Sequence, residues 1–237
     1  MSTEQRVAVV TGGNRGIGLE ICGQLADRGY QVVLAARDAG RAAKLAAELD
    51  ASRPGAVTSV RLDVAEAGSV QTAFREIRER HHRIDVLVNN AGIAVDGPDH
   101  RPSAPDLAVV LRTLETNLLG AWRCCAEVVP SMHERGYGRI VNLSSTMASL
   151  ELTRTSTSPA YRISKTGLNM LTRTLAAELD GTGILVNAAS PGYTLTDMSP
   201  DAQRPVRAGA DTPVWLATLP DTGPTGGFFF DRETLAW

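Results

Sequence analysis

Tyr161 and Lys165 are the residues whose types and spacing most directly suggest chemistry in this sequence. A separation of four residues puts both side chains on one face of a helix, where they can meet over the same pocket. An ammonium group beside a phenol favours the phenolate, so we expect Lys165 to lower the pKa of Tyr161 from its usual value of about 10. The pair predicts a phenol that exchanges a proton near neutral pH. Because such pairs are common and usually structural, the interpretation depends on the residues around it.

A glycine-rich segment follows the first apolar run of the chain and reads Thr11-Gly12-Gly13-Asn14-Arg15-Gly16-Ile17-Gly18. Between a strand and a helix, glycines permit a tight turn, a close approach of the backbone to a pyrophosphate, and close packing of the helix on the strand. The free N–H groups at the start of the helix suit the phosphates. The segment therefore predicts a dinucleotide site, although glycines also serve turns that bind nothing.

These motifs lie in an alternation of short apolar runs with stretches of helical periodicity. Strands are predicted at 6–10, 31–35, 57–62, 86–89, 139–143 and 184–188. Helices are predicted at 17–28, 39–50, 69–81 and 161–179, and somewhere within 106–134. This order predicts one α/β domain over 1–237, a Rossmann-type doubly wound parallel sheet with helices on both faces. The loops at 96–105 and 152–159 follow strands at their carboxyl ends, where such sheets place their ligand crevice.

The spacing Thr-Gly-x-x-x-Gly-x-Gly resembles the cofactor motif of the short-chain dehydrogenase/reductase family. The other landmarks of that family follow in order across nearly the whole chain: Asn89-Asn90-Ala91-Gly92, Asn117, Ser145, Tyr161 with Lys165, and Pro191-Gly192. The resemblance implies an oxidoreductase that reduces a ketone or aldehyde by hydride transfer, with Tyr161 as the general acid.

The resemblance also implies roles at the reacting end. Ser145 would hydrogen-bond the carbonyl oxygen of the substrate and stabilise the charge that grows there. Ser144 competes for this role, but the family pattern uses the second serine of such a pair. Asn117 would hold a water in line with Lys165, through which the phenolate recovers its proton; a polar residue that kinks the helix is the alternative, and both roles can coexist. The predicted catalytic residues are Asn117, Ser145, Tyr161 and Lys165.

By the same resemblance, several segments hold the cofactor. Asp63 and Val64 match the position that contacts the adenine, and the segment around Thr194 and Thr196 would hold the nicotinamide carboxamide. The predicted cofactor-binding residues are Gly12, Asn14, Arg15, Gly16, Ile17, Gly18, Arg37, Asp63, Val64, Asn90, Ala91, Gly92, Tyr161, Lys165, Pro191, Gly192, Thr194 and Thr196.

The end of the second strand, Ala35-Ala36-Arg37-Asp38, bears on which dinucleotide is bound. An acidic side chain there would pair with a ribose 2′-hydroxyl and a basic one with a 2′-phosphate. Arg37 and Arg15 could clamp that phosphate, since guanidinium geometry suits bidentate contacts. We expect Asp38 to cap the following helix instead. The prediction is NADP(H), and two surface arginines without a ligand are the alternative.

The C-terminal part, from Gly209 to Trp237, resembles the monomeric NADPH carbonyl reductases of animals and related plant reductases. Those relatives often carry a long insertion before the reactive tyrosine, and the short spacing between Ser145 and Tyr161 leaves no room for one. The insertion covers the helices through which other members of the family associate. We therefore expect a homodimer or homotetramer formed through the helices within 106–134 and 161–179.

Composition narrows the class of partner. With 24 basic and 26 acidic residues, the formal net charge is −2, which gives no footprint for nucleic acid or an anionic membrane. The absence of a signal peptide and of a membrane-length apolar run predicts a cytoplasmic protein with a small-molecule carbonyl substrate. Three cysteines, two of them adjacent, predict reduced core thiols and no metal site. The basic run at 78–83 is interpreted as the solvated end of a helix.

Two other functions remain open. A ketoreductase acting on a polyketide or an acyl-thioester β-ketone would use the same residues. A non-catalytic NADP-binding regulator would keep the fold but would have no need of Asn117, Ser145, Tyr161 and Lys165 together.

Overall fold

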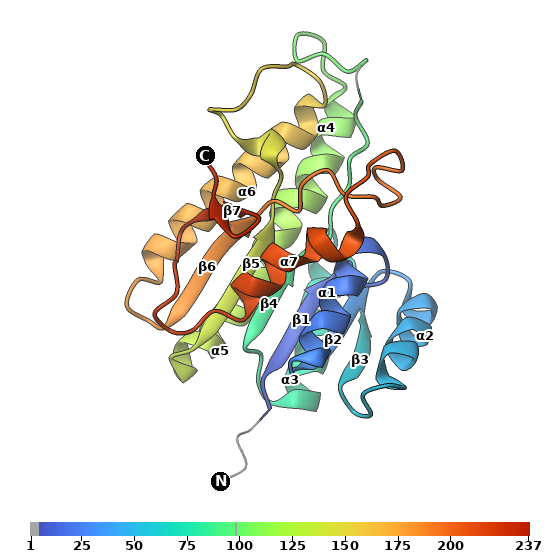
Figure 1. Cartoon of the computed structure of the whole chain (residues 1–237), viewed down its shortest axis with the longest axis vertical. Coiled ribbons are helices and arrows are strands. Elements are labelled where there is room, and N and C mark those ends of the chain that lie inside the picture. The colour runs from blue at the N-terminus through green and yellow to red at the C-terminus, as the bar shows by residue number, and fades with distance from the viewer. Residues whose placement is uncertain (1–4, 98) are drawn as a thin grey trace.

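The computed structural model describes residues 5–97 and 99–237, so residues 1–4 of the polar N-terminus and Pro98 of the expected 96–105 loop lie outside the description. The described strands form one sheet in the order β3-β2-β1-β4-β5-β6-β7-β8 (Figure 1). The pairings from β3 through to β7 are parallel, and β8 pairs antiparallel with β7. The strands are β1 (Val7–Thr11), β2 (Gln31–Ala36), β3 (Val57–Arg61), β4 (Val86–Asn89), β5 (Gly138–Leu143), β6 (Ile184–Ala189), β7 (Phe228–Phe230) and β8 (Glu233–Thr234).

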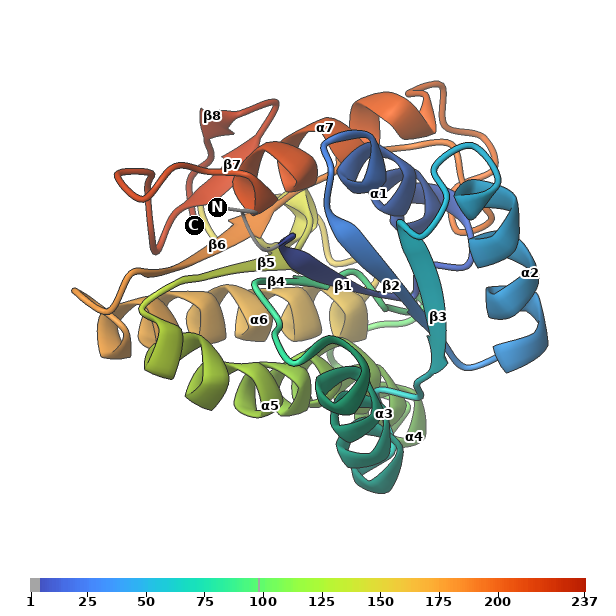
Figure 2. The ribbon, with the colours of Figure 1, turned by 90° about the horizontal axis from the view of Figure 1, so that it is seen from below.

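The central strands are apolar on both faces because helices cover both faces of the sheet. Every residue of β1, β4, β5 and β6 is buried. One core lies under α1, α2 and α7, and the other lies under α3, α5 and α6 (Figure 2). The helices are α1 (Gly16–Asp27), α2 (Ala39–Asp50), α3 (Ala67–His81), α4 (Leu107–Leu114), α5 (Gly120–Arg135), α6 (Pro159–Glu178) and α7 (Val206–Ala217). The predicted doubly wound α/β fold is confirmed.

The long helix expected within 106–134 is present, but one π-helical turn interrupts its α-helical geometry. It begins at α4, whose first N–H groups are capped by the Asp106 carboxylate, passes through a π-helical turn at Glu115–Leu119 (η1), and continues as α5. A π-helical turn takes one residue more than an α-helical turn and is often found at functional sites. Asn117 lies in this turn and is buried.

The carboxyl-terminal part adds β7 and β8 to the sheet edge, which periodicity did not predict. Strands of three and two residues are too short to show an alternating pattern. Side-chain packing holds this edge: Phe228 stacks on Trp237, and Phe229 meets Trp215 of α7 edge to face. The chain therefore closes the sheet beside β6, whose carboxyl end borders the site.

Two structural interpretations of the sequence are confirmed. The basic run at 78–83 is the end of α3, where His82 adopts a left-handed conformation (φ 59°) and Arg78 pairs with Glu127. The three cysteines are free and buried, and burial raises their pKa, that of Cys125 to about 12. Over residues 5–97 and 99–237, no helix combines the length and apolar character needed to cross a membrane. The same residues contain no cluster of three or more His, Cys, Asp or Glu suited to a metal ion.

Candidate active site

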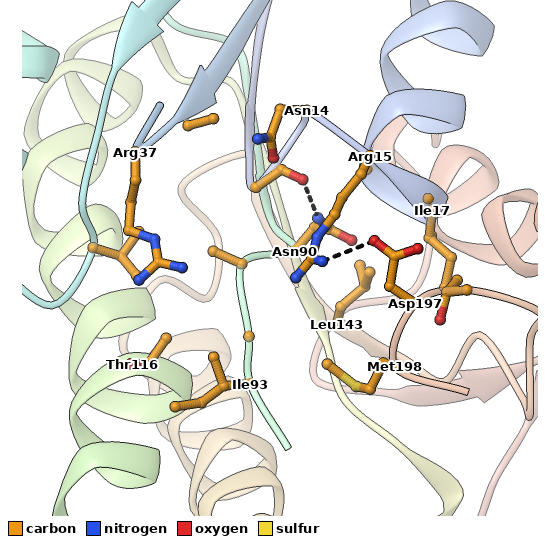
Figure 3. Close-up of a pocket in the computed structure, with 18 of the residues that line it drawn as sticks. Asn14, Arg15, Ile17, Arg37, Asn90, Ile93, Thr116, Leu143, Asp197 and Met198 are labelled. Carbon is orange, nitrogen blue, oxygen red and sulfur yellow. Dashed lines mark hydrogen bonds and ion pairs between the residues drawn. The ribbon is translucent and has the colours of Figure 1, made fainter. Parts of the chain in front are cut away.

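A cavity of about 410 Å³ opens at the carboxyl ends of β1, β2, β4, β5 and β6. Its position follows from the parallel sheet, whose strand order reverses next to β1. The structure brings most of the predicted cofactor-binding residues to its wall (Figure 3). Those residues are Gly12, Asn14, Arg15, Gly16, Ile17, Gly18, Arg37, Asp63, Val64, Asn90, Ala91, Gly92, Tyr161, Lys165, Pro191 and Thr196.

The glycine loop is fastened to the end of β4 by Asn90. The Asn90 amide donates to the carbonyl oxygens of Thr11 (2.9 Å) and Gly12 (3.1 Å), and the Thr11 hydroxyl accepts from the Asn90 and Ala91 N–H groups. A Cβ on Gly18 would lie 2.4 Å from both the Asn90 amide nitrogen and the Gly12 carbonyl oxygen. Gly18 is therefore required by the close approach of the loop to its own helix, as the motif predicts.

Two arginines lie at the β2 end of the cavity. Arg37 follows β2, and Arg41 lies in the first turn of α2. Asp38 also lines the cavity, and its carboxylate accepts from the Arg41 N–H (2.9 Å), which caps α2. The expected capping role of Asp38 is therefore confirmed. Arg41 was missed in the sequence, although a basic residue in the first turn after Arg37 was a usable signal.

Arg15 pairs across the cavity with a residue that the sequence did not single out. Its guanidinium lies 2.9 Å from the Asp197 carboxylate, and both side chains are more than half exposed (Figure 3). Close by, Thr196 lies near the glycine loop, since a Cβ on Gly16 would lie 3.3 Å from its methyl group. The segment after β6 thus closes one side of the cavity against the glycine loop.

Tyr161 and Lys165 occupy the other end of the cavity, on α6. The Lys165 Nζ lies 5.9 Å from the centre of the Tyr161 ring and donates to the Leu143 carbonyl oxygen at 2.6 Å. Burial lowers the pKa of Lys165 to about 8. Burial also raises the pKa of Tyr161, so the expectation of a lowered pKa is wrong here: the loss of solvent is the largest influence on this phenol.

The two candidate serines point in different directions. Ser144 is buried and lines the cavity, and its hydroxyl donates to the Lys165 carbonyl oxygen at 3.5 Å. Ser145 is partly exposed, and its hydrogen bond with the Tyr161 side chain lowers the pKa of that phenol. The same hydroxyl accepts from the Met147 N–H at 3.2 Å. The side chain beside the phenol is therefore that of Ser145, the residue favoured by the sequence.

Asn117 lies in the π-helical turn, and its side chain approaches the end of the cavity that contains Tyr161 and Lys165. Its side chain accepts from the Ile93 N–H (2.8 Å) and donates to the Ile93 carbonyl oxygen (2.9 Å) and to the Ser164 hydroxyl (3.0 Å). A Cβ on Gly92 would lie 3.3 Å from the Asn117 Oδ1 and 3.4 Å from the Lys165 Nζ. Gly92 thus lets these two side chains approach each other. Because the Asn117 amide is already engaged, the water relay stays a prediction.

Three predicted site residues lie outside the cavity wall besides Asn117. Ser145 is hydrogen-bonded to the Tyr161 side chain, while Gly192 and Thr194 shape the segment after β6. Gly192 has φ 72°, and a Cβ there would lie 2.7 Å from the Phe230 ring. The Thr194 hydroxyl donates to the Pro191 carbonyl oxygen at 2.9 Å. Gly192 thus permits a close approach to β7, and Thr194 has a hydrogen bond within the segment.

The sequence also missed a carboxylate next to Tyr161. Asp96, in the loop after β4, accepts hydrogen bonds from the N–H groups of Ala160 (2.7 Å) and Tyr161 (3.3 Å) and is 7% exposed. No sequence motif predicts this contact, because it joins a loop to the first turn of a helix far away in the chain. Other wall residues that were not predicted are Ala36, Leu62, Ile93, Thr116, Leu143 and Met198.

Comparison with known proteins gives consistent results. Residues 6–206 match the family model described as short chain dehydrogenase. The chain is 34% identical to carbonyl reductase (NADPH) 3 of Mus musculus over 285 aligned positions, covering all of both chains. It is 36% identical to D-threitol dehydrogenase of Mycolicibacterium smegmatis over 231 positions, covering 98% of this chain and 83% of the relative. Among solved structures, a gluconate 5-dehydrogenase of Burkholderia cenocepacia in complex with NADP and tartrate superimposes with a TM-score of 0.84 at 29% identity, covering 95% of this chain and 92% of the other.

Proposed function

Because this chain belongs to the short-chain dehydrogenase family and is therefore an oxidoreductase, we propose that it reduces a ketone or an aldehyde to an alcohol with NADPH. The supporting observation is a single cavity with arginines at one end and a phenol beside a buried lysine at the other. A nicotinamide dinucleotide needs both ends, since one holds its phosphates and the other faces its reactive ring.

The residues at the β2 end fit a 2′-phosphate better than a free ribose 2′-hydroxyl. Arg37 and Arg41 are two cations on the wall. The neighbouring acidic group, Asp38, is directed to the helix cap by its hydrogen bond from the Arg41 N–H. A 2′-phosphate would therefore meet guanidinium groups, which bind phosphate bidentately. The name of the relative from Mus musculus and the NADP bound by the gluconate 5-dehydrogenase support the same choice.

At the reacting end, Tyr161 acts as the proton donor, and bound NADPH supplies the hydride. The substrate oxygen lies between the hydroxyls of Ser145 and Tyr161, where both donate to the charge that develops on it. A phenol with a raised pKa is fully protonated at neutral pH and so is ready to donate. Lys165, with a pKa of about 8, can pass a proton back to the phenolate near neutral pH.

The loops around the reacting end favour an apolar, uncharged substrate. Large apolar side chains are exposed on the segments that leave β4, β5 and β6: Val95, Leu150, Leu152, Tyr193, Leu195 and Met198. Burying such groups against a substrate is favourable at about 25 cal/mol per Å², which a polyhydroxylated substrate does not offer. We therefore favour aryl or alkyl carbonyls over polyols of the kind named for the threitol and gluconate enzymes.

The test is NADPH oxidation by the purified protein with quinones, aryl ketones, aldehydes and acyl thioesters, with NADP⁺ reduction by polyols measured alongside. We expect turnover with aryl ketones, quinones or aldehydes and much weaker activity with polyols. Clear preference for an acyl thioester would favour the β-ketoreductase. If NADPH binds but no substrate turns over, the non-catalytic regulator is the better description.

We also propose that the protein associates through α4, α5 and α6. These helices and the π-helical turn between α4 and α5 carry exposed apolar side chains: Leu107, Leu111, Leu119, Trp122, Ile163 and Met170. Such a face is unusual on a monomer, and the short spacing between Ser145 and Tyr161 provides no insertion to cover it. Light scattering at micromolar concentration should give a dimer or tetramer of the 25.2 kDa chain, and a monomer mass would contradict the proposal.

A further inference from the structure

Tyr161 lies in the first turn of α6. The N–H groups of this turn donate hydrogen bonds to a residue from another part of the chain. Pro159 is the first helical residue and has no N–H to satisfy. The next two, those of Ala160 and Tyr161, both donate to the Asp96 carboxylate. At most helices the residue before the first turn provides this cap. Here the side chain of Ser158 donates to the Asp96 carbonyl oxygen at 3.3 Å instead.

The contact between Asp96 and the start of α6 includes two features that are costly unless the surrounding structure stabilises them. Asp96 is 7% exposed, and a buried carboxylate is costly unless it is hydrogen-bonded. Ser158 adopts a left-handed conformation (φ 53°, ψ 53°), which residues other than glycine rarely adopt. Both features follow from bringing the loop after β4 against the start of α6.

Resting on the proposed function, we propose that Asp96 is a positioning residue for Tyr161. It fixes the first turn of α6 against the loop that leaves β4, and so sets where the phenol stands relative to Ser145 and the substrate. It acts through the backbone of Tyr161 and needs no contact with the substrate.

Because Asp96 is charged, this positioning role predicts a change in the pH dependence of the rate, which helix capping alone would not cause. Asp96 raises the pKa of Tyr161, and the hydrogen bond from Ser145 lowers it. Lys165 faces the phenol from the same helix, while Arg162 is directed to backbone carbonyl oxygens. Removing the charge of Asp96 should therefore lower the pKa of Tyr161. A proton donor with a lower pKa loses its proton earlier, so the decline of the reduction rate at alkaline pH should begin at lower pH.

Asp96→Asn tests the charge, since it keeps one oxygen acceptor in the same place. We expect turnover at neutral pH to fall by about tenfold or more, because small displacements of a reacting group are costly. The alkaline decline should move to lower pH, and the NADPH dissociation constant should stay within about twofold of wild type, since Asn90 and the glycine loop are untouched. Asp96→Glu keeps the charge on a longer arm, so turnover should fall while the alkaline decline stays in place.

Asp106 offers a matched control, because its carboxylate caps α4 by accepting from Ala108 (2.9 Å) and Val109 (3.2 Å). Asp106→Asn should lower the melting temperature without moving turnover or the pH profile. Wild-type turnover and pH profile in Asp96→Asn would overturn the positioning role, as would a parallel loss of NADPH binding. If the wild-type enzyme reduces no carbonyl compound, the proposed function itself is wrong, and that result is separate from the comparison of variants.

Discussion

Asn90 and Asp96 both lie in the segment that follows β4, and each holds one end of the cavity in place. Asn90 does so with a neutral group and Asp96 with a charged one. The neutral amide of Asn90 holds two carbonyl oxygens of the glycine loop, whereas the buried carboxylate of Asp96 holds two N–H groups of α6. The proposed cofactor end thus offers backbone groups and the exposed arginines Arg37 and Arg41 to a ligand. The reacting end offers side chains that have lost much of their solvent.

Under the proposed function, this difference separates cofactor binding from catalysis. Ions in contact with water interact weakly, so changes at the cofactor end should alter affinity by modest factors. Burial shifts the pKa of Tyr161 and of Lys165, so changes at the reacting end should alter rates and pH dependence. Each prediction below tests whether a residue acts at only one of the two ends.

The largest expected effect belongs to Tyr161→Phe, which removes one oxygen and leaves the ring to pack. General acid catalysis is typically worth about 10²–10⁴-fold, so turnover should fall by at least a hundredfold. The NADPH dissociation constant should change little, because the glycine loop and Arg37 are unaltered. Single-turnover hydride transfer at saturating NADPH measures the chemical step directly.

Tyr137→Phe is the matched control, since Tyr137 precedes β5 at the amino end of the parallel strands, away from the cavity, and its hydroxyl is also buried. Its turnover should equal that of the wild type. If Tyr161→Phe transfers hydride within a few-fold of the wild-type rate, Tyr161 is not the acid. That result would contradict the assignment of catalysis to this end of the cavity.

At the cofactor end, Arg37→Ala should weaken NADPH binding by at least about tenfold, equivalent to about 1.4 kcal/mol, and leave NADH binding nearly unchanged. The reason is that the 2′-phosphate loses a guanidinium, and NADH has no such phosphate. Arg41→Ala should act in the same direction. Titration calorimetry with both cofactors gives the comparison, and equal losses for NADPH and NADH would refute the assignment of this end to the 2′-phosphate.

The smallest effect concerns stability at the reacting end. The pKa of Lys165 is about 8 in the folded chain and about 10.4 for an unperturbed lysine, so between these values the unfolded chain binds more protons. The contribution of Lys165 to stability therefore rises with pH across that window, and its burial cost is complete below pH 8. Lys165→Met removes this dependence, so the melting temperature of the variant relative to wild type should fall by a few degrees between pH 8 and pH 10. A difference that stays constant over that range would show that Lys165 has an ordinary pKa.

The sequence predicted the cofactor end better than the reacting end. Gly12, Gly16 and Gly18 lie in one short segment, and their spacing directly reports the turn they form. Tyr161 and Lys165 were also found, since one helix turn relates them. Asp96 was missed because its contact depends on a loop packing against the first turn of α6, and no local sequence pattern indicates such a tertiary contact.

The direction of the Tyr161 pKa shift was also predicted wrongly from the sequence. The neighbouring ammonium of Lys165 predicted a lowered pKa for Tyr161, but burial raises that pKa. Burial depends on the whole fold, so spacing could not reveal it. The strands β7 and β8 were missed for a related reason: they are ordered by aromatic packing against Trp215 and Trp237, and their own sequences are too short to show a period.

The π-helical turn at Glu115–Leu119 also determines how this enzyme could change by gaining or losing single residues. Each residue of an α-helix advances about 100° around the axis. Deleting one residue from the turn would restore ordinary helical geometry and rotate α4 by about that angle relative to α5, carrying Asn117 away from Lys165. The sheet-facing residues of α5, such as Cys125 and Val128, would stay in place. The extra residue of the π-helical turn thus sets the direction of the Asn117 side chain without changing which residues of α5 face the core.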